Sequence, residues 1–255
     1  LYPMEFISNQ TFLWRSERDG YDSFYLYNID GRFIKKIFNK NYVVKEFLGF
    51  QENNIYFSTY TKDALGIDLW KSSIDKKNVK KIVSDGSYHD FKISPTKKFV
   101  IDNFSNLETP RIIRILNTHN GDVISELLTA KNPLINYNIG ETEIFTIKTD
   151  GGIALNARLI KPYNFDRKKK YPSLVYVYNG PGVQLIRNNW LASSPLWMYY
   201  LANEGYIIFT VDGRGSENRG LDFEQVIFGK LGQIEMIDQL KGYDILIKKP
   251  FIDKN

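Results

Sequence analysis

The first half of the chain repeats with a period of about 45 residues, and this repeat restricts the fold more than any other feature. Residues 33–38 (FIKKIF) match residues 78–83 (NVKKIV), and residues 99–102 and 111–117 belong to a third copy. Within each copy, short runs alternate between apolar and polar residues, as strands with one buried face do. Repeats of ~40–50 residues with about four short strands are typical of β-propeller blades.

Four dipeptides that end in glycine separate these runs. They are Asp19-Gly20, Asp30-Gly31, Asp85-Gly86 and Asn120-Gly121. Asp-Gly and Asn-Gly supply the positive φ angles that tight hairpins need. We expect complete blades at about residues 42–85 and 87–130, and a blade at residues 1–39 that lacks its first strand. Because propellers usually close with ~4–8 blades, three blades predict a piece of a longer protein.

After about residue 140 the pattern changes. Residues 143–148 and 153–161 alternate in polarity around a Thr-Asp-Gly-Gly turn, which predicts a hairpin. Residues 174–178 (LVYVY) and 206–211 (YIIFTV) are short apolar runs, typical of parallel strands that are covered on both faces. A hairpin followed by alternating strands and helices is the beginning of an open α/β sheet.

The helices expected in this second part are at residues 195–203, 223–228 and 233–248. Ser193 or Ser194 is expected to cap the first helix. The third helix should be amphipathic, and a further parallel strand should follow it. Its expected buried positions are Ile234, Ile237, Leu240 or Lys241, Asp244 or Ile245, and Leu246. The predicted fold class is mixed, with a partial all-β propeller before an α/β part.

Composition excludes several kinds of site. The chain has no cysteine, which rules out disulfides, thiolate nucleophiles and cysteine metal sites. Its net charge is +5, but the basic residues are scattered, and the run at 167–170 precedes Tyr171 in a predicted solvated loop. No apolar run approaches the ~20 residues of a membrane span. The only histidines, His89 and His119, fall in the blades without a second ligand nearby, so we expect no metal site.

Tyr178 stands where chemistry is expected. It ends the run at 174–178, directly before an Asn-Gly-Pro turn, and ligands of open α/β sheets bind beyond the carboxyl ends of the strands. A core tyrosine with a solvated hydroxyl is the alternative. No serine lies in a G-x-S-x-G nucleophile elbow, since Ser216 follows Gly215 in a predicted loop. Nor is there a P-loop or a G-x-G-x-x-G motif, so the residues alone predict no complete catalytic apparatus and no cofactor.

Five segments carry a family resemblance. They are residues 12–21 (FLWRSERDGY), 89–95 (HDFKISP), 170–181 (KYPSLVYVYNGP), 211–216 (VDGRGS) and 223–239 (FEQVIFGKLGQIEMIDQ). In this order, and over nearly the whole chain, they resemble the dipeptidyl peptidase IV branch of the prolyl oligopeptidase family, especially its bacterial members. Proteins of this family join an eight-bladed propeller to an α/β-hydrolase domain and release N-terminal dipeptides, with a preference for Pro or Ala as the second residue.

The resemblance implies a serine dipeptidyl peptidase that uses Ser-His-Asp acyl transfer without a metal or cofactor. Residues 1–135 would be the C-terminal blades of the propeller, and residues 136–255 the N-terminal part of the catalytic domain. Tyr178 matches the family's oxyanion-hole tyrosine, the one functional role that carries over. The family's Gly-Trp-Ser-Tyr-Gly-Gly elbow, its triad Asp and His and its paired glutamates do not occur in this sequence. We therefore expect the chain alone to be inactive.

The resemblance also implies a peptide substrate, homodimers and a periplasmic or cell-surface location. For Arg187 and Trp190, near the same rim, a packing role is favoured over substrate contact. Arg214 is expected to anchor its Gly-rich loop through hydrogen bonds. Two alternatives remain open. One is a non-catalytic propeller module that binds protein or carbohydrate, and the other is a nucleic-acid binder, which rests only on the basic charge.

Overall fold

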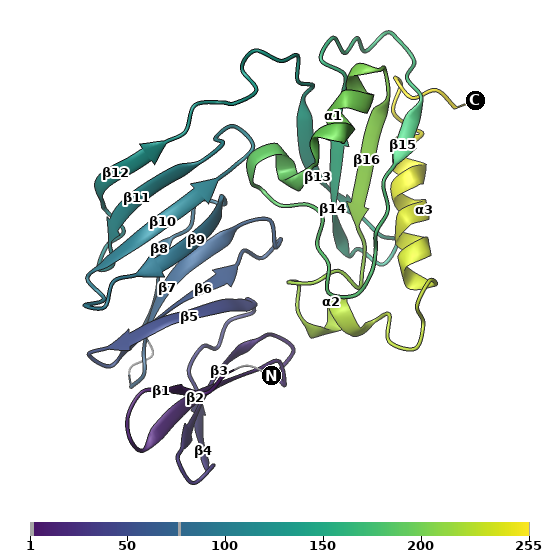
Figure 1. The fold of residues 1–255 in the computed structure, drawn as a ribbon. Helices are drawn as coiled ribbons and strands as arrows, with labels where there is room; N and C mark the ends of the chain where they lie inside the picture. Colours follow the sequence, from purple (N-terminus) through teal and green to yellow (C-terminus); the bar gives the residue numbers. More distant parts are fainter. Residues whose placement is uncertain (1–2, 76–77, 255) are drawn as a thin grey trace. The chain divides into compact units, whose positions relative to one another are not determined.

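The computed structural model describes residues 3–75 and 78–254. The chain separates into two compact units (Figure 1). Unit 1 consists of Leu1–Phe104, Arg111–Thr129 and Asn218–Asp222, and unit 2 of Ser105–Pro110, Ala130–Glu217 and Phe223–Asn255. The domain boundary between residues 135 and 136 stays a prediction.

Unit 1 contains three successive four-stranded antiparallel sheets, each with its strands in chain order. The first holds β1 (Glu5–Phe6), β2 (Thr11–Ser16), β3 (Ser23–Asn28) and β4 (Phe33–Lys36). The second holds β5 (Val44–Gln51), β6 (Asn54–Tyr60), β7 (Ile67–Ser73) and β8 (Val79–Val83). The third holds β9 (Tyr88–Ile93), β10 (Phe99–Ser105), β11 (Ile112–Asn117) and β12 (Val123–Thr129). These sheets confirm the predicted blades of a partial propeller.

The prediction that the first blade lacks its first strand is wrong. The two-residue strand β1 pairs with β2, with Glu5 opposite Leu13 and Phe6 opposite Phe12. The rings of Phe6 and Phe12 also meet, at 5.8 Å between centroids. Two residues are too few to show an alternating pattern, so sequence periodicity could not reveal this strand.

The glycines at the predicted turns do adopt positive φ angles. Gly20, Gly31 and Gly121 have φ of 90°, 84° and 87°, and each lies between two strands of one sheet. Gly86, with φ of 83°, differs because it joins β8 to β9 and so connects two sheets instead of closing a hairpin. The dipeptide signal gives the local backbone conformation, whereas the strand partner depends on residues far away in the chain.

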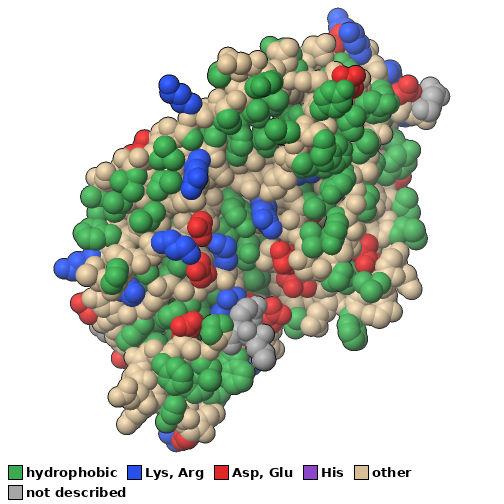
Figure 2. Space-filling view, in the orientation of Figure 1, with side chains coloured by type: hydrophobic (Ala, Val, Ile, Leu, Met, Phe, Trp, Pro, Cys, Tyr) green, Lys and Arg blue, Asp and Glu red, His purple; other side chains and the backbone are tan. Residues whose placement is uncertain are grey.

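Consecutive sheets of unit 1 are held together by buried aromatic side chains. Phe24 and Phe38, from the first sheet and the segment after it, meet Phe57 of the second sheet edge to face, with centroids 5.4 and 4.9 Å apart. Phe38 also contacts Trp70 at 5.2 Å. Such pairs contribute about 0.5–1.5 kcal/mol beyond the area that they bury. By contrast, Phe6 and Phe33 of the first sheet are exposed. Figure 2 shows hydrophobic side chains gathered over the region of this sheet.

Unit 2 is built on a sheet with the order β13-β14-β16-β15. Its strands are β13 (Thr142–Lys148), β14 (Ala154–Ile160), β15 (Ser173–Val175) and β16 (Ile207–Asp212). Its helical segments are the 3₁₀ turn at Trp190–Ser193, α1 (Leu196–Asn203) and α3 (Ile234–Leu246), whereas α2 (Leu221–Gln225) spans the division between the units at residues 222 and 223. β13, β14 and β16 are antiparallel neighbours, and β15 runs parallel to β16. This is the predicted beginning of an α/β-hydrolase sheet, with β16 entirely buried.

The prediction that residues 174–178 form a strand covered on both faces is wrong. β15 spans only Ser173–Val175 and is half-buried, although the Tyr176 N–H still donates to the Phe209 carbonyl at 2.8 Å. The reason is its place at the end of the sheet order. On its other side, the described chain adds only a parallel bridge between Tyr171 and Ile252.

The predicted helix starts are also corrected. Pro195, in an extended conformation, occupies the N-cap of α1, and no side-chain cap bond from Ser193 or Ser194 is present among the described residues. Ser193 itself has φ of 60°, because the left-handed 3₁₀ turn continues to that residue. The short helix expected at 223–228 is found at Leu221–Gln225.

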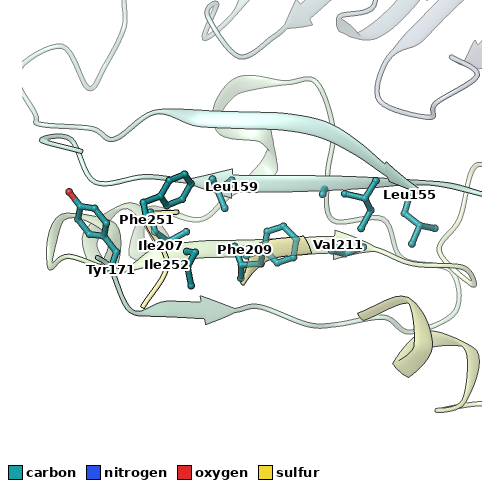
Figure 3. Packing of buried hydrophobic residues seen from close by; sticks show 11 residues of the cluster. Leu155, Leu159, Tyr171, Ile207, Phe209, Val211, Phe251 and Ile252 are labelled. Atoms are coloured by element: carbon teal, nitrogen blue, oxygen red, sulfur yellow. The ribbon is translucent and has the colours of Figure 1, made fainter. Parts of the chain in front are cut away.

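The predicted buried face of α3 is right only in part. Leu246 is buried, and Ile234, Lys241 and Ile245 are half-buried, as predicted. Ile237 and Leu240 are 54% and 55% exposed, whereas Asp238 and Gly242 are buried. A Cβ atom on Gly242 would lie 2.7 Å from the Val211 side chain, so the missing side chain is what lets the helix approach β16. Figure 3 shows Phe209 and Val211 of β16 in the cluster that this helix covers. A hydrophobic-pattern rule cannot find a helix face built from a glycine and a paired carboxylate.

Gly242→Ala should destabilise unit 2 by about 0–2 kcal/mol. Alanine adds about 1 kcal/mol of helix propensity, but overpacking against Val211 costs about 1–3 kcal/mol. Hydrogen–deuterium exchange of the β16 amides measures the change. Asp244→Ala, at an exposed position on the same helix, is the control and should change exchange little. Equal protection in both variants would contradict the close-packing explanation.

Candidate functional site

Tyr178 lies in the turn beyond the carboxyl end of β15, and its side chain is 58% exposed. Its ring lies over Gly180, where a Cβ atom would stand 2.9 Å from the ring carbon Cε1. Glycine at this position therefore leaves the space that the ring occupies. A phenol in such a place can donate a hydrogen bond to a bound group, because its hydroxyl is accessible.

The turn that carries Tyr178 is tied to two other elements. Asn179 adopts a left-handed conformation with φ of 47°, which asparagine tolerates better than most residues. Its Nδ2 donates to the carbonyl of Glu235 in α3 at 3.3 Å, and its Oδ1 accepts from the Gly213 N–H at 3.4 Å. The residue next to Tyr178 thus connects the turn to the end of β16 and to the first turn of α3.

Asp212, the last residue of β16, binds the segment that follows this turn. Its Oδ1 accepts from the Leu185 N–H at 3.0 Å, and its Oδ2 accepts from the Ile186 N–H at 2.8 Å. Burial raises the pKa of Asp212 to about 6, against the opposing effects of these two N–H groups and of the charges of Arg158 and Arg187. The carboxylate is therefore charged at neutral pH and costs free energy in the folded state.

This raised pKa predicts that the stability of unit 2 falls with rising pH. The folded carboxyl binds its proton more tightly than the unfolded one, whose pKa is 3.8. The stabilisation from this tighter binding is therefore largest below pH 4 and is lost between pH 4 and about 6. A shift of about two pKa units corresponds to about 3 kcal/mol. Asp212→Asn should remove this dependence, as measured by exchange of the β14 and β16 amides between pH 4 and 7. An unchanged profile in the variant would contradict it.

Arg214 anchors the Gly-rich loop after β16, as predicted. Its guanidinium binds both carboxylate oxygens of the buried Asp238, with 2.7 Å between Nη2 and Oδ1. The Arg214 N–H also donates to Asp238 Oδ2, at 2.7 Å. Ser216 donates to the Gly213 carbonyl at 2.9 Å and is buried, so it closes the loop as a structural serine and is no accessible nucleophile.

The packing role expected of the two other rim residues stays a prediction. Arg187 lies 4.0 Å from Glu217, and the Trp190 N–H donates to Ser105 at 3.3 Å. Sequence analysis missed Arg158, which β14 buries beneath the rim. Its guanidinium donates to the Ala192 carbonyl at 2.7 Å and to Thr210 at 3.1 Å. A single arginine in an alternating strand gives no sign that it points inward.

His89 is a buried structural histidine, as expected, and has no solvent exposure. Its ring nitrogens contact Asp102 at 2.7 Å and Asp85 at 2.8 Å, and its ring stacks on Phe91. Burial lowers the pKa of His89, but the two carboxylates outweigh it and the pKa is raised. Over residues 3–75 and 78–254, no group of three or more His, Asp or Glu side chains is arranged to hold a metal.

Comparisons with known proteins agree with this architecture. Residues 2–111 match the model of the dipeptidyl peptidase IV N-terminal region, and residues 192–255 match that of the prolyl oligopeptidase family. The chain belongs to the dipeptidyl peptidase IV branch of the prolyl oligopeptidase family. A crystal structure described as a dipeptidyl aminopeptidase IV from Bacteroides ovatus is similar to this chain, with 33% sequence identity and a TM-score of 0.93. The match covers 98% of this chain and 39% of that one.

Further members of the family are similar over shorter shares of their length. Human dipeptidyl peptidase 8 is 32% identical over 210 residues, which are 78% of this chain and 23% of that protein. The structure of Porphyromonas gingivalis dipeptidyl peptidase 4 matches with 25% identity and a TM-score of 0.88, over 98% of this chain and 36% of that one. The chain thus spans about a quarter of the curated relatives that it matches. None of its described helices has the length and apolar content needed to cross a bilayer.

Proposed function

We propose that this chain is part of a serine-type dipeptidyl peptidase in which Tyr178 supplies one donor of the oxyanion hole. The observation that carries the proposal is the exposed phenol of Tyr178 on a turn fastened to the end of β16. A hydroxyl aimed at a tetrahedral oxyanion stabilises charge that develops only in the transition state. The substrates would be peptides with a free N-terminus and Pro or Ala as the second residue.

The test is a peptidase assay of the complete protein that contains this sequence. It should release p-nitroaniline from glycyl-prolyl-p-nitroanilide and leave the N-acetylated analogue intact, because a dipeptidyl peptidase needs the free amine. The 1–255 polypeptide should give no turnover, since its sequence has no G-x-S-x-G elbow. Cleavage of the acetylated substrate alone, or of neither, would contradict the proposal.

Homodimers and a periplasmic or cell-surface location belong to the same proposal and rest on the family relationship. Light scattering of the complete protein should give twice the chain mass. The nucleic-acid alternative has less support, because on the face in Figure 2 the Lys and Arg side chains are interspersed with Asp and Glu and form no continuous stripe.

A further inference from the structure

We propose that Asp212 is a positioning residue that holds the turn of Tyr178 in its working place. The inference rests on the proposed role of Tyr178 in the oxyanion hole. Asp212 touches no reacting atom in this proposal, and it acts by fastening the backbone of the segment that leads away from the turn.

Hydrogen bonds attach both ends of the segment 179–186 to the end of β16, and we call this arrangement the clip. At one end, Asn179 accepts from the Gly213 N–H, and at the other, Asp212 accepts from the N–H groups of Leu185 and Ile186. Both ends are thus attached to two consecutive residues where β16 ends. The buried Gln184 adds a bond from its amide to the Ile186 carbonyl, at 2.8 Å. A loop fixed at both ends to one rigid strand has little freedom to move the phenol at its start.

The chemistry of Asp212 supports a role other than fold stability. The side chain is 4% exposed, and both of its oxygens are used by backbone N–H groups. Charge-assisted hydrogen bonds of this kind are stronger than neutral ones and so hold the backbone more rigidly. Yet burying the charge opposes folding, since burial dominates over its partners. A buried charge that opposes folding beside a candidate site is the pattern expected where function and stability conflict.

A double-mutant cycle in the complete protein tests the inference. Tyr178→Phe and Asp212→Asn are measured singly and together with glycyl-prolyl-p-nitroanilide. We expect Asp212→Asn to lower kcat about tenfold with KM unchanged, and to add almost nothing to Tyr178→Phe, because it acts through that hydroxyl. Asn179→Gly, which removes the other attachment and tolerates the left-handed backbone, should behave in the same way. Asp244→Asn, exposed on α3, is the matched control and should leave kcat unchanged.

Hydrogen–deuterium exchange of the amides of residues 179–186 supplies a second readout. Asp212→Asn should increase their exchange at pH 7 while leaving the β14 amides at least as protected as before. If Tyr178→Phe slows the enzyme but Asp212→Asn is without effect or fully additive, the positioning role is overturned and the proposed function stands. If Tyr178→Phe leaves kcat unchanged, both the positioning role of Asp212 and the proposed role of Tyr178 are overturned. Unchanged exchange in the loop would also overturn the clip.

Discussion

Replacing Tyr178 by phenylalanine should lower kcat of the complete protein in the proposed peptidase reaction by about 10²–10³-fold, with a small effect on KM. Removal of one oxyanion-hole donor typically costs about 2.7–4 kcal/mol of transition-state stabilisation. The substrate carbonyl gains little from the phenol in the ground state, so binding is nearly unaffected. The fold should also be unaffected, because the side chain is 58% exposed. Steady-state kinetics with glycyl-prolyl-p-nitroanilide measure both constants.

Tyr200→Phe provides the matched control, because Tyr200 is an exposed tyrosine on α1 in the same unit. Its kcat should equal that of the unmodified enzyme. Equal kcat for the Tyr178 variant would show that the reaction does not use its hydroxyl. The alternative of a core tyrosine does not fit a side chain that is 58% exposed. A rise in KM with kcat unchanged would assign Tyr178 to substrate binding instead.

Arg214→Ala should lower the stability of unit 2 by about 3–5 kcal/mol. The substitution leaves Asp238, which has no solvent exposure, as a buried carboxylate without its guanidinium. Breaking a buried pair from one side costs this much, because the remaining charge is uncompensated. The loop from Gly213 to Ser216 also loses the guanidinium bonds to α3, while the backbone N–H of residue 214 still donates to Asp238. Exchange of the α3 and β16 amides reports the free energy of opening.

Arg167→Ala, in the exposed basic run, is the control for the loss of a positive charge. Its free energy of unfolding should differ by no more than about 0.5 kcal/mol from that of the unmodified protein. Asp238→Asn combined with Arg214→Ala should recover part of the loss, since the buried charge is then gone. A small effect of Arg214→Ala alone would show that water reaches Asp238 and that the loop is held by its backbone bonds.

The elements with a strong local signal were predictable. The 45-residue repeat and the Asp-Gly and Asn-Gly turns identify the blades, because each blade is a local meander whose neighbours in the chain are its neighbours in space. β16 and its hairpin partners are also found from their patterns. The wrong predictions concern elements whose length or buried face depends on residues far away in the chain. β15 is an edge strand, β1 has two residues, and α3 turns Gly242 and Asp238 toward the sheet instead of Ile237.

The same distinction between local signals and distant contacts applies to the candidate site. The place of Tyr178 was predictable, since the end of a strand before a sharp turn is a local arrangement, and its role in an oxyanion hole stays a prediction. The residues that hold it were not predictable. Asp212 lies 27 residues from Leu185 in sequence, and Asp238 lies 24 from Arg214. The chain order of residue types specifies short-range conformation. Hydrogen bonds across such separations exist only once the sheet has brought its strand ends together, so tertiary structure alone decides which carboxylate anchors which loop.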